Sequence, residues 1–93
     1  MDLHIKDVLK KFIKDQDVVG DQYYAQKVRN FWKERFAESI NTRIRDISLY
    51  RGKLTVSVDS APLRHELFMN RDKIKSEINE HLGENIVRYL ELK

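Results

Sequence analysis

The most informative residues of the chain are Gly52-Lys-Leu-Thr-Val-Ser-Val-Asp-Ser-Ala-Pro-Leu-Arg-His-Glu-Leu67, which join a strand to a helix with a signal at each junction. In the first half, three apolar residues alternate with polar ones, the period of a strand with one face on a core: Leu54, Val56 and Val58. Ser60 can accept a bond from the free N–H groups of a helix start, and Pro62 fits the first helical turn. We therefore predict a strand over residues 53–59 and a helix from about Ala61.

A second alternating run precedes this stretch and predicts a β-hairpin. We expect Ile47 and Leu49 to point inward, with Arg45 and Arg51 on the same face. The opposite face of this strand should carry Ile44, Asp46, Ser48 and Tyr50. Arg51-Gly52 lies between the two runs, and glycine can supply the positive φ that a tight hairpin turn needs.

Two helices are predicted before the hairpin. Residues 2–15 place apolar side chains at helical spacing, with Lys6, Lys10 and Lys14 on another face. Residues 15–21 contain a glycine and three aspartates and predict a connection. Residues 22–40 then repeat apolar and aromatic side chains at intervals of three and four, which predicts a second helix with core residues that include Trp32 and Phe36.

A long helix and a last strand are predicted after the hairpin. The helix should run from about 61 to 82, with Gly83 as a left-handed cap and one apolar stripe: Leu63, Leu67, Ile74, Ile78 and Leu82. Phe68 and Met69 flank this stripe, either as an edge of the core or as an exposed contact for a partner. Residues 86–92 predict a strand parallel to 53–59, with Ile86, Leu90 and Leu92 on one face and Val87, Tyr89 and Glu91 on the other.

Composition limits the chain to a few classes of protein. With 93 residues we expect a single domain over 1–93, and 35% charged residues without a long apolar run argue against a membrane protein. The absence of cysteine excludes disulfides and thiolate chemistry. No signal peptide is visible, so we expect a cytoplasmic protein.

The sequence offers no pattern typical of an enzyme or of a cofactor site. His4, His65 and His81 are scattered, and Glu77 with His81 is only a pair where a metal needs three or more ligands. The glycines are isolated, so no phosphate-binding loop is present. We therefore predict a non-enzyme with no metal, no cofactor and no small-molecule substrate.

The most basic stretch coincides with the hairpin and is the candidate binding site. Residues 43–53 hold four basic residues against the single acid Asp46: Arg43, Arg45, Arg51 and Lys53. Basic groups on a rigid hairpin can follow phosphates without reading bases. Tyr50 can add stacking on a base, although a cross-strand packing role is equally compatible with its position.

The chain closely resembles the DciA family, in the short form common in Bacteroidetes. The resemblance is carried by the Gly52–Leu67 stretch, with Ser60-Ala-Pro-Leu-Arg64 as its most specific piece, together with Trp32 and Leu82-Gly83. It implies an α+β fold of order ααββαβ, similar to a type II K-homology domain with a three-stranded mixed sheet. It also implies a bacterial replication protein that binds DNA and assists loading of the replicative helicase.

Function therefore has one leading interpretation and two alternatives. The leading one is a nucleic-acid-binding adaptor, with single-stranded DNA and the replicative helicase as partners. One alternative is a protein-interaction or oligomerisation module that uses an exposed strand edge or the Phe68 and Met69 side of the long helix. The other is an RNA-binding module similar to a K-homology domain. The chain has no Gly-x-x-Gly loop, by which K-homology domains hold a nucleic-acid backbone, so any nucleic acid must be held differently.

Overall fold

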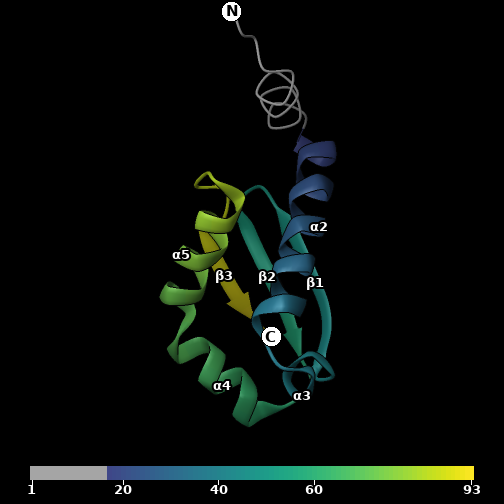
Figure 1. Ribbon diagram of the computed structural model, residues 1–93, viewed down its shortest axis with the longest axis vertical. Helices are drawn as coiled ribbons and strands as arrows, with labels where there is room; N and C mark the ends of the chain where they lie inside the picture. The colour runs from purple at the N-terminus through teal and green to yellow at the C-terminus, as the bar shows by residue number, and fades with distance from the viewer. Residues whose placement is uncertain (1–16) are drawn as a thin grey trace, which may run out of the picture.

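The computed structural model describes residues 17–93 (Figure 1). In chain order, this part contains α2 (Asp17–Arg35), α3 (Glu38–Asn41), β1 (Ile44–Tyr50), β2 (Lys53–Val58), α4 (Ala61–Met69), α5 (Arg71–Leu82) and β3 (Tyr89–Leu92). The helix predicted over residues 2–15, its lysine row and His4 lie outside the described residues.

The three strands form one mixed sheet in the order β1-β2-β3. β1 pairs with β2 antiparallel, from Ile44 opposite Val58 to Tyr50 opposite Lys53. β2 pairs with β3 parallel, from Lys53 beside Tyr89 to Val56 beside Leu92. The predicted α+β class, hairpin and parallel last strand are confirmed.

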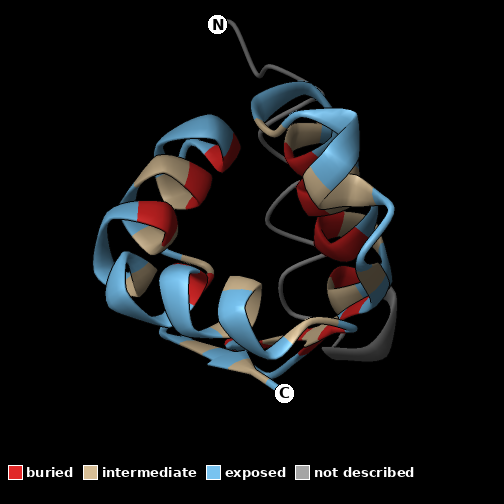
Figure 2. Cartoon of the chain, turned by 90° about the horizontal axis from the view of Figure 1, so that it is seen from below, coloured by how far each residue is buried: buried red, intermediate tan, exposed pale blue. Residues whose placement is uncertain are grey.

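The helices lie on one side of the sheet, and the core fills the space between the two layers. In Figure 2 the helices are above the sheet, and the buried positions of α2 and α5 turn toward the interior. β2 crosses the middle, and its inward side chains Leu54 and Val56 are fully buried. The largest fully buried side chain is Trp32 of α2, which confirms its predicted core role, while Phe36 is partly buried against the core.

The start of α2 differs from the prediction. Residues 17–21 were expected to be a connection, but the helix begins at Asp17 and passes through Gly20. Glycine within a helix costs only about 1 kcal/mol relative to alanine, which packing of the rest of the helix offsets. Asp21 also has a partner, because its carboxylate accepts a bond from the Arg51 N–H at 3.1 Å.

The predicted helix over 22–40 is interrupted after Arg35. Ala37 is extended, with φ −65° and ψ 158°, and the short helix α3 follows. The Asn41 side-chain amide donates to the carbonyls of Phe36 at 2.9 Å and Lys33 at 3.4 Å. These bonds satisfy carbonyls at the end of α2 that no further helical turn reaches.

The long helix predicted over 61–82 is divided at Asn70. This residue has φ −107° and ψ 15°, and its side chain donates to the Glu66 carbonyl at 2.9 Å. The bend allows both parts to face the sheet, because the predicted apolar stripe is buried or half-buried on each side of it. Gly83 ends α5 with φ 78°, which confirms the predicted left-handed cap.

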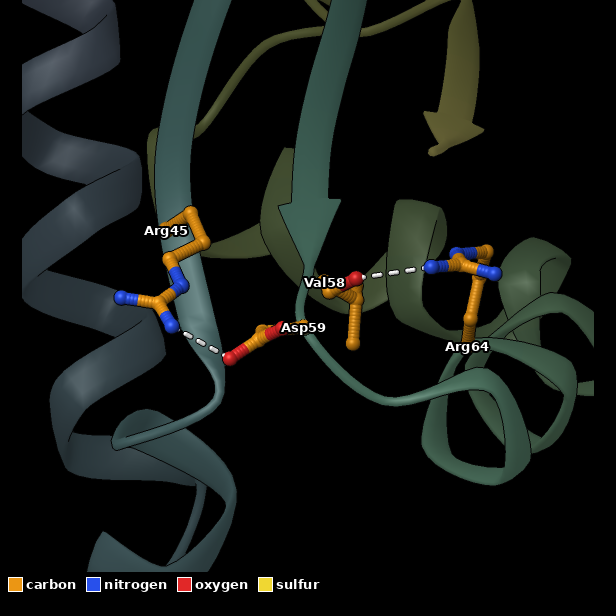
Figure 3. Close-up of polar contacts among 4 residues, drawn as sticks. All are labelled: Arg45, Val58, Asp59 and Arg64. Atoms are coloured by element: carbon orange, nitrogen blue, oxygen red, sulfur yellow. Dashed lines mark hydrogen bonds and ion pairs between the residues drawn. The ribbon is translucent and has the colours of Figure 1, made fainter.

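The junction between β2 and α4 agrees with the prediction from Ser60-Ala-Pro-Leu-Arg64. The Ser60 hydroxyl accepts a bond from the Leu63 N–H at 3.4 Å, and Pro62 lies in the first turn of the helix. Arg64 then reaches back and donates to the Val58 carbonyl at 2.9 Å (Figure 3). The first turn of α4 is thereby tied to the end of β2.

β1 contains a β-bulge at Arg45. Ile44 lies opposite Val58 and Asp46 lies opposite Ser57, so Arg45 is the extra residue. The prediction that Ile44 shares the outer face with Asp46 is wrong, because the extra residue shifts the alternation and Ile44 packs against the core. Arg45 is exposed for the same reason, although strict alternation assigns it to the inner face.

The segment between α5 and β3 is held by Asn79. Its amide Nδ2 donates to the Val87 carbonyl at 2.9 Å, and the Val87 N–H donates to Asn79 Oδ1 at 2.8 Å. The prediction of a strand from Ile86 is therefore corrected, because β3 begins only at Tyr89. Val87, expected on the outer face, is 2% exposed. It lies outside β3, and the Asn79 side chain satisfies its backbone N–H and C=O groups in place of a neighbouring strand.

The assignment of the inner and outer faces of the sheet can be tested with Val56→Asp. An unpaired carboxylate at this fully buried position should cost several kcal/mol, which is comparable with the total stability of a small domain. We expect loss of the cooperative thermal transition in circular dichroism. Thr55→Asp, on the other face of the same strand, is the control and should melt within a few degrees of the parent.

The role of Asn79 can be tested with Asn79→Ala. This change leaves the buried N–H and C=O of Val87 without their side-chain partners, so the free energy of unfolding in urea should fall by about 2 kcal/mol or more. Asn85→Ala is the control, because Asn85 is exposed in the same loop. Equal losses for the two variants would contradict the role assigned to Asn79.

Candidate nucleic-acid interface

The hairpin turn is formed by Arg51 and Gly52, as predicted. Both residues have positive φ, 46° for Arg51 and 87° for Gly52. Two consecutive positive φ values are typical of two-residue hairpin turns, in which the twist of the turn matches the twist of the two strands. The turn places the Arg51 side chain at one end of the sheet, next to the first residue of β2, Lys53.

The last strand approaches the same turn. The Gly52 carbonyl accepts bonds from the N–H groups of Arg88 at 2.7 Å and Tyr89 at 3.1 Å. A Cβ atom at position 52 would lie 3.3 Å from both Cγ and Cδ of Arg88, so the arginine stem packs directly over the glycine. Three cationic residues therefore occupy neighbouring positions at this end of the sheet: Arg51, Lys53 and Arg88. We call them the turn-end cluster.

Acidic residues partly balance the turn-end cluster. Lys53 Nζ lies 3.2 Å from Glu91 Oε2, and both side chains are about half exposed. Asp21 accepts the backbone N–H of Arg51 from the other side. The Arg51 guanidinium lies over the ring of Tyr50, 5.4 Å from its centroid. The cluster is thus cationic but not isolated from carboxylates.

Arg43 and Arg45 lie at the other end of the hairpin. A strand of seven residues separates the two ends by roughly 20 Å. Arg45 forms an ion pair with Asp59, which follows β2 (Figure 3). The predicted basic site is therefore divided into two groups. Arg51 and Lys53 lie together at the turn, and Arg43 and Arg45 lie at the opposite end of the hairpin.

A cavity of about 300 Å³ opens beside the turn-end cluster. Its lining includes Asp21 and Tyr24 of α2, together with Arg51 and Arg88. The Tyr24 hydroxyl donates to Glu84 Oε2 at 2.9 Å. Burial, and then the neighbouring Glu84 carboxylate, raise the pKa of Tyr24 above its ordinary value, so this phenol stays neutral. The lining combines cationic and acidic groups.

Phe68 and Met69 are exposed, so they do not form an edge of the buried core. Phe68 is 48% exposed and Met69 is 69% exposed, at the end of α4. The Arg71 guanidinium lies 4.1 Å from the centroid of the Phe68 ring. Figure 1 shows the junction of α4 and α5 at the side of the molecule, in the half away from the hairpin turn. The apolar pair therefore lies apart from the turn-end cluster.

Two residues of this region were missed by sequence reasoning: Arg88 and Tyr89. The parallel strand was predicted, but only its register places Tyr89 beside Lys53 and Arg88 over Gly52. One clue was Gly52 itself, because a glycine has no Cβ and allows another segment to approach closely. The identity of that segment is not encoded locally.

Residues 17–93 contain neither a cluster of metal ligands nor a membrane span. No group of three or more His, Asp or Glu side chains in this part could hold a metal ion. In the same range, no helix combines the length and the apolar character needed to cross a bilayer.

Comparisons with known proteins give one family. No curated protein and no solved structure matches the chain, so the expected likeness to a type II K-homology domain stays a prediction. The family model described as "Dna[CI] antecedent, DciA" matches residues 4–92, nearly the whole chain. This family is associated with loading of the replicative helicase and is not a known catalytic family. The chain therefore belongs to the DciA family.

Proposed function

We propose that the protein is a non-enzymatic adaptor that binds nucleic acid through the turn-end cluster and assists loading of the replicative helicase. The observation that carries the proposal is that Arg51, Lys53 and Arg88 occupy neighbouring positions around one rigid turn. The rigidity comes from paired strands and from the two bonds accepted by the Gly52 carbonyl. A fixed group of cations of this kind is suited to phosphate oxygens.

The expected binding is weak, sequence-tolerant and dependent on salt. Side chains that contact phosphates position a protein without reporting sequence, and each contact releases counterions. The pair between Lys53 and Glu91 does not prevent this role, because exposed ion pairs contribute only about 0–1 kcal/mol. Lys53 can therefore exchange the carboxylate for a phosphate at little cost.

Arg43 and Arg45 supply a second phosphate contact when the nucleic-acid strand is long enough to reach them. They lie on the same hairpin as the turn-end cluster, roughly 20 Å away along β1. Arg45 is exposed but paired with Asp59, so its contribution requires exchange of that partner as well. Tyr50 belongs to the turn end, where the residue is 66% exposed.

The turn-end cluster can be tested with Arg51→Glu combined with Lys53→Glu. We expect loss of measurable binding to single-stranded DNA in fluorescence anisotropy, with a melting temperature within a few degrees of the parent. A variant that retains residual binding should show a salt dependence flatter by about one unit per lost phosphate contact.

The control for this experiment is Arg43→Glu combined with Arg45→Glu, which makes the same change in charge at the far end of the hairpin. It should weaken binding less than the turn-end variant, because it removes only the second contact. Unchanged affinity in the turn-end variant would contradict the proposal. An RNA strand of the same sequence, measured in parallel, tests the RNA-binding alternative.

A partner surface at Phe68 and Met69 is the second proposal, favoured by their exposure in the half of the molecule away from the turn. An exposed apolar pair at a helix end is suited to a protein contact. The family association with helicase loading makes the replicative helicase the partner to test.

This partner surface can be tested with Met69→Glu. The change should abolish capture of the purified replicative helicase by the immobilised protein while DNA binding persists, because the carboxylate would be desolvated in an apolar contact. Gln22→Glu, which places the same new charge on an exposed position of α2, should capture the helicase normally.

A further inference from the structure

Three residues form a row across the sheet at the turn end. Tyr50 of β1 lies opposite Lys53 of β2, and Lys53 lies beside Tyr89 of β3. Tyr50 is 66% exposed and Tyr89 is 71% exposed. We call these three residues the tyrosine row. It places a lysine between two exposed aromatic rings, one on each edge strand.

The tyrosine row lies on the face of the sheet that the described helices leave uncovered. Inward positions of β2 are buried, whereas Lys53, Thr55 and Ser57 alternate with them and face away from the core. In the described part of the chain this outer face also carries small or polar side chains: Asp46, Ser48 and Glu91. The result is a polar surface with two large rings at one end.

The stability of the sheet does not account for the two rings. Tyr50 and Tyr89 are separated by β2, so two strand spacings, roughly 9–10 Å, lie between their backbones. They are therefore not a directly opposed cross-strand pair, which is the arrangement that stabilises a sheet. Their high exposure also means that folding buries little of their apolar surface.

We propose that the tyrosine row is a stacking surface that selects single-stranded nucleic acid. Unpaired bases stack on Tyr50 and Tyr89, and Lys53 contacts the backbone between them. The inference rests on the proposed function, because the turn-end cluster supplies the phosphate contacts beside the row. Bases in a duplex are already stacked and cannot lie on the rings, so selection for single strands follows.

Two neighbouring side chains adjust the surface. The Arg51 guanidinium, 5.4 Å from the Tyr50 ring centroid, covers that ring in the free protein and is well placed to move to a phosphate when a base replaces it. Glu91 pairs with Lys53 on the same outer face and repels an approaching backbone. Removing the Glu91 charge should therefore strengthen binding.

The test compares an intact single strand with an abasic strand of equal length, which has the same phosphates but no bases. The parent should bind the intact strand more tightly, and Tyr50→Ala combined with Tyr89→Ala should bind the two equally. The loss for the intact strand should be roughly tenfold or more, because stacking contributes about 1–3 kcal/mol per base. The salt dependence should not change, since no cation is removed.

The matched control is Tyr50→Phe combined with Tyr89→Phe, which keeps both rings and should bind like the parent. Thermal melts of all variants establish that they are folded. Glu91→Gln should bind the intact strand severalfold more tightly than the parent. If Glu91→Gln binds the intact strand no more tightly than the parent does, the nucleic-acid backbone does not lie along the tyrosine row.

The outcomes separate this inference from the proposed function. If the double alanine variant keeps parental affinity while the Arg51→Glu and Lys53→Glu variant loses it, the stacking surface is wrong and the turn-end cluster stands. Equal binding of intact and abasic strands by the parent would also contradict the stacking surface, and it would leave the turn-end cluster standing. If the parent binds no oligonucleotide at low salt, the proposed function fails and the tyrosine row fails with it.

Discussion

The candidate interface depends on Gly52. Its φ of 87° closes the hairpin, its carbonyl accepts the N–H groups of Arg88 and Tyr89, and its missing Cβ leaves room for the Arg88 stem. The first requirement alone would permit asparagine, which tolerates a positive φ. A Cβ at this position would lie only 3.3 Å from the Arg88 stem, so any other side chain would require that stem to shift. One position thus joins the turn, the last strand and the cations.

The register of β3 is fixed from two sides, by Gly52 and by Asn79. Gly52 bonds the first residue of the strand, and Asn79 holds Val87 two residues earlier through both of its backbone groups. Side chains alternate between the faces of a strand, so a slip by one residue would turn Tyr89 into the core and Leu90 outward. The exposed position of Tyr89 is therefore a consequence of these backbone bonds.

Features that depend on neighbouring residues were predictable from the sequence, whereas those that depend on pairing between distant segments were not. The hairpin turn, the inward side chains of β2 and the helix caps at Ser60 and Gly83 follow from local rules, and the structure confirms each of them. The bulge at Arg45 appears only when β1 is aligned with β2. Arg88 and Tyr89 join the site only through the parallel register with β2. The basic hairpin was thus predicted in part, and its nearest neighbours on the last segment were missed.

The balance of charges at the proposed interface indicates what the cations and the rings would each contribute to binding. The turn-end cluster carries three cations, but Glu91 pairs with one of them and Asp21 accepts the backbone N–H of another. Phosphate contacts alone would therefore give modest affinity and no preference between duplex and single strand. Stacking on exposed rings adds free energy that a duplex cannot supply, because its bases are already stacked. A small protein with a formal net charge of only +3 can in this way favour single strands without a strongly basic surface.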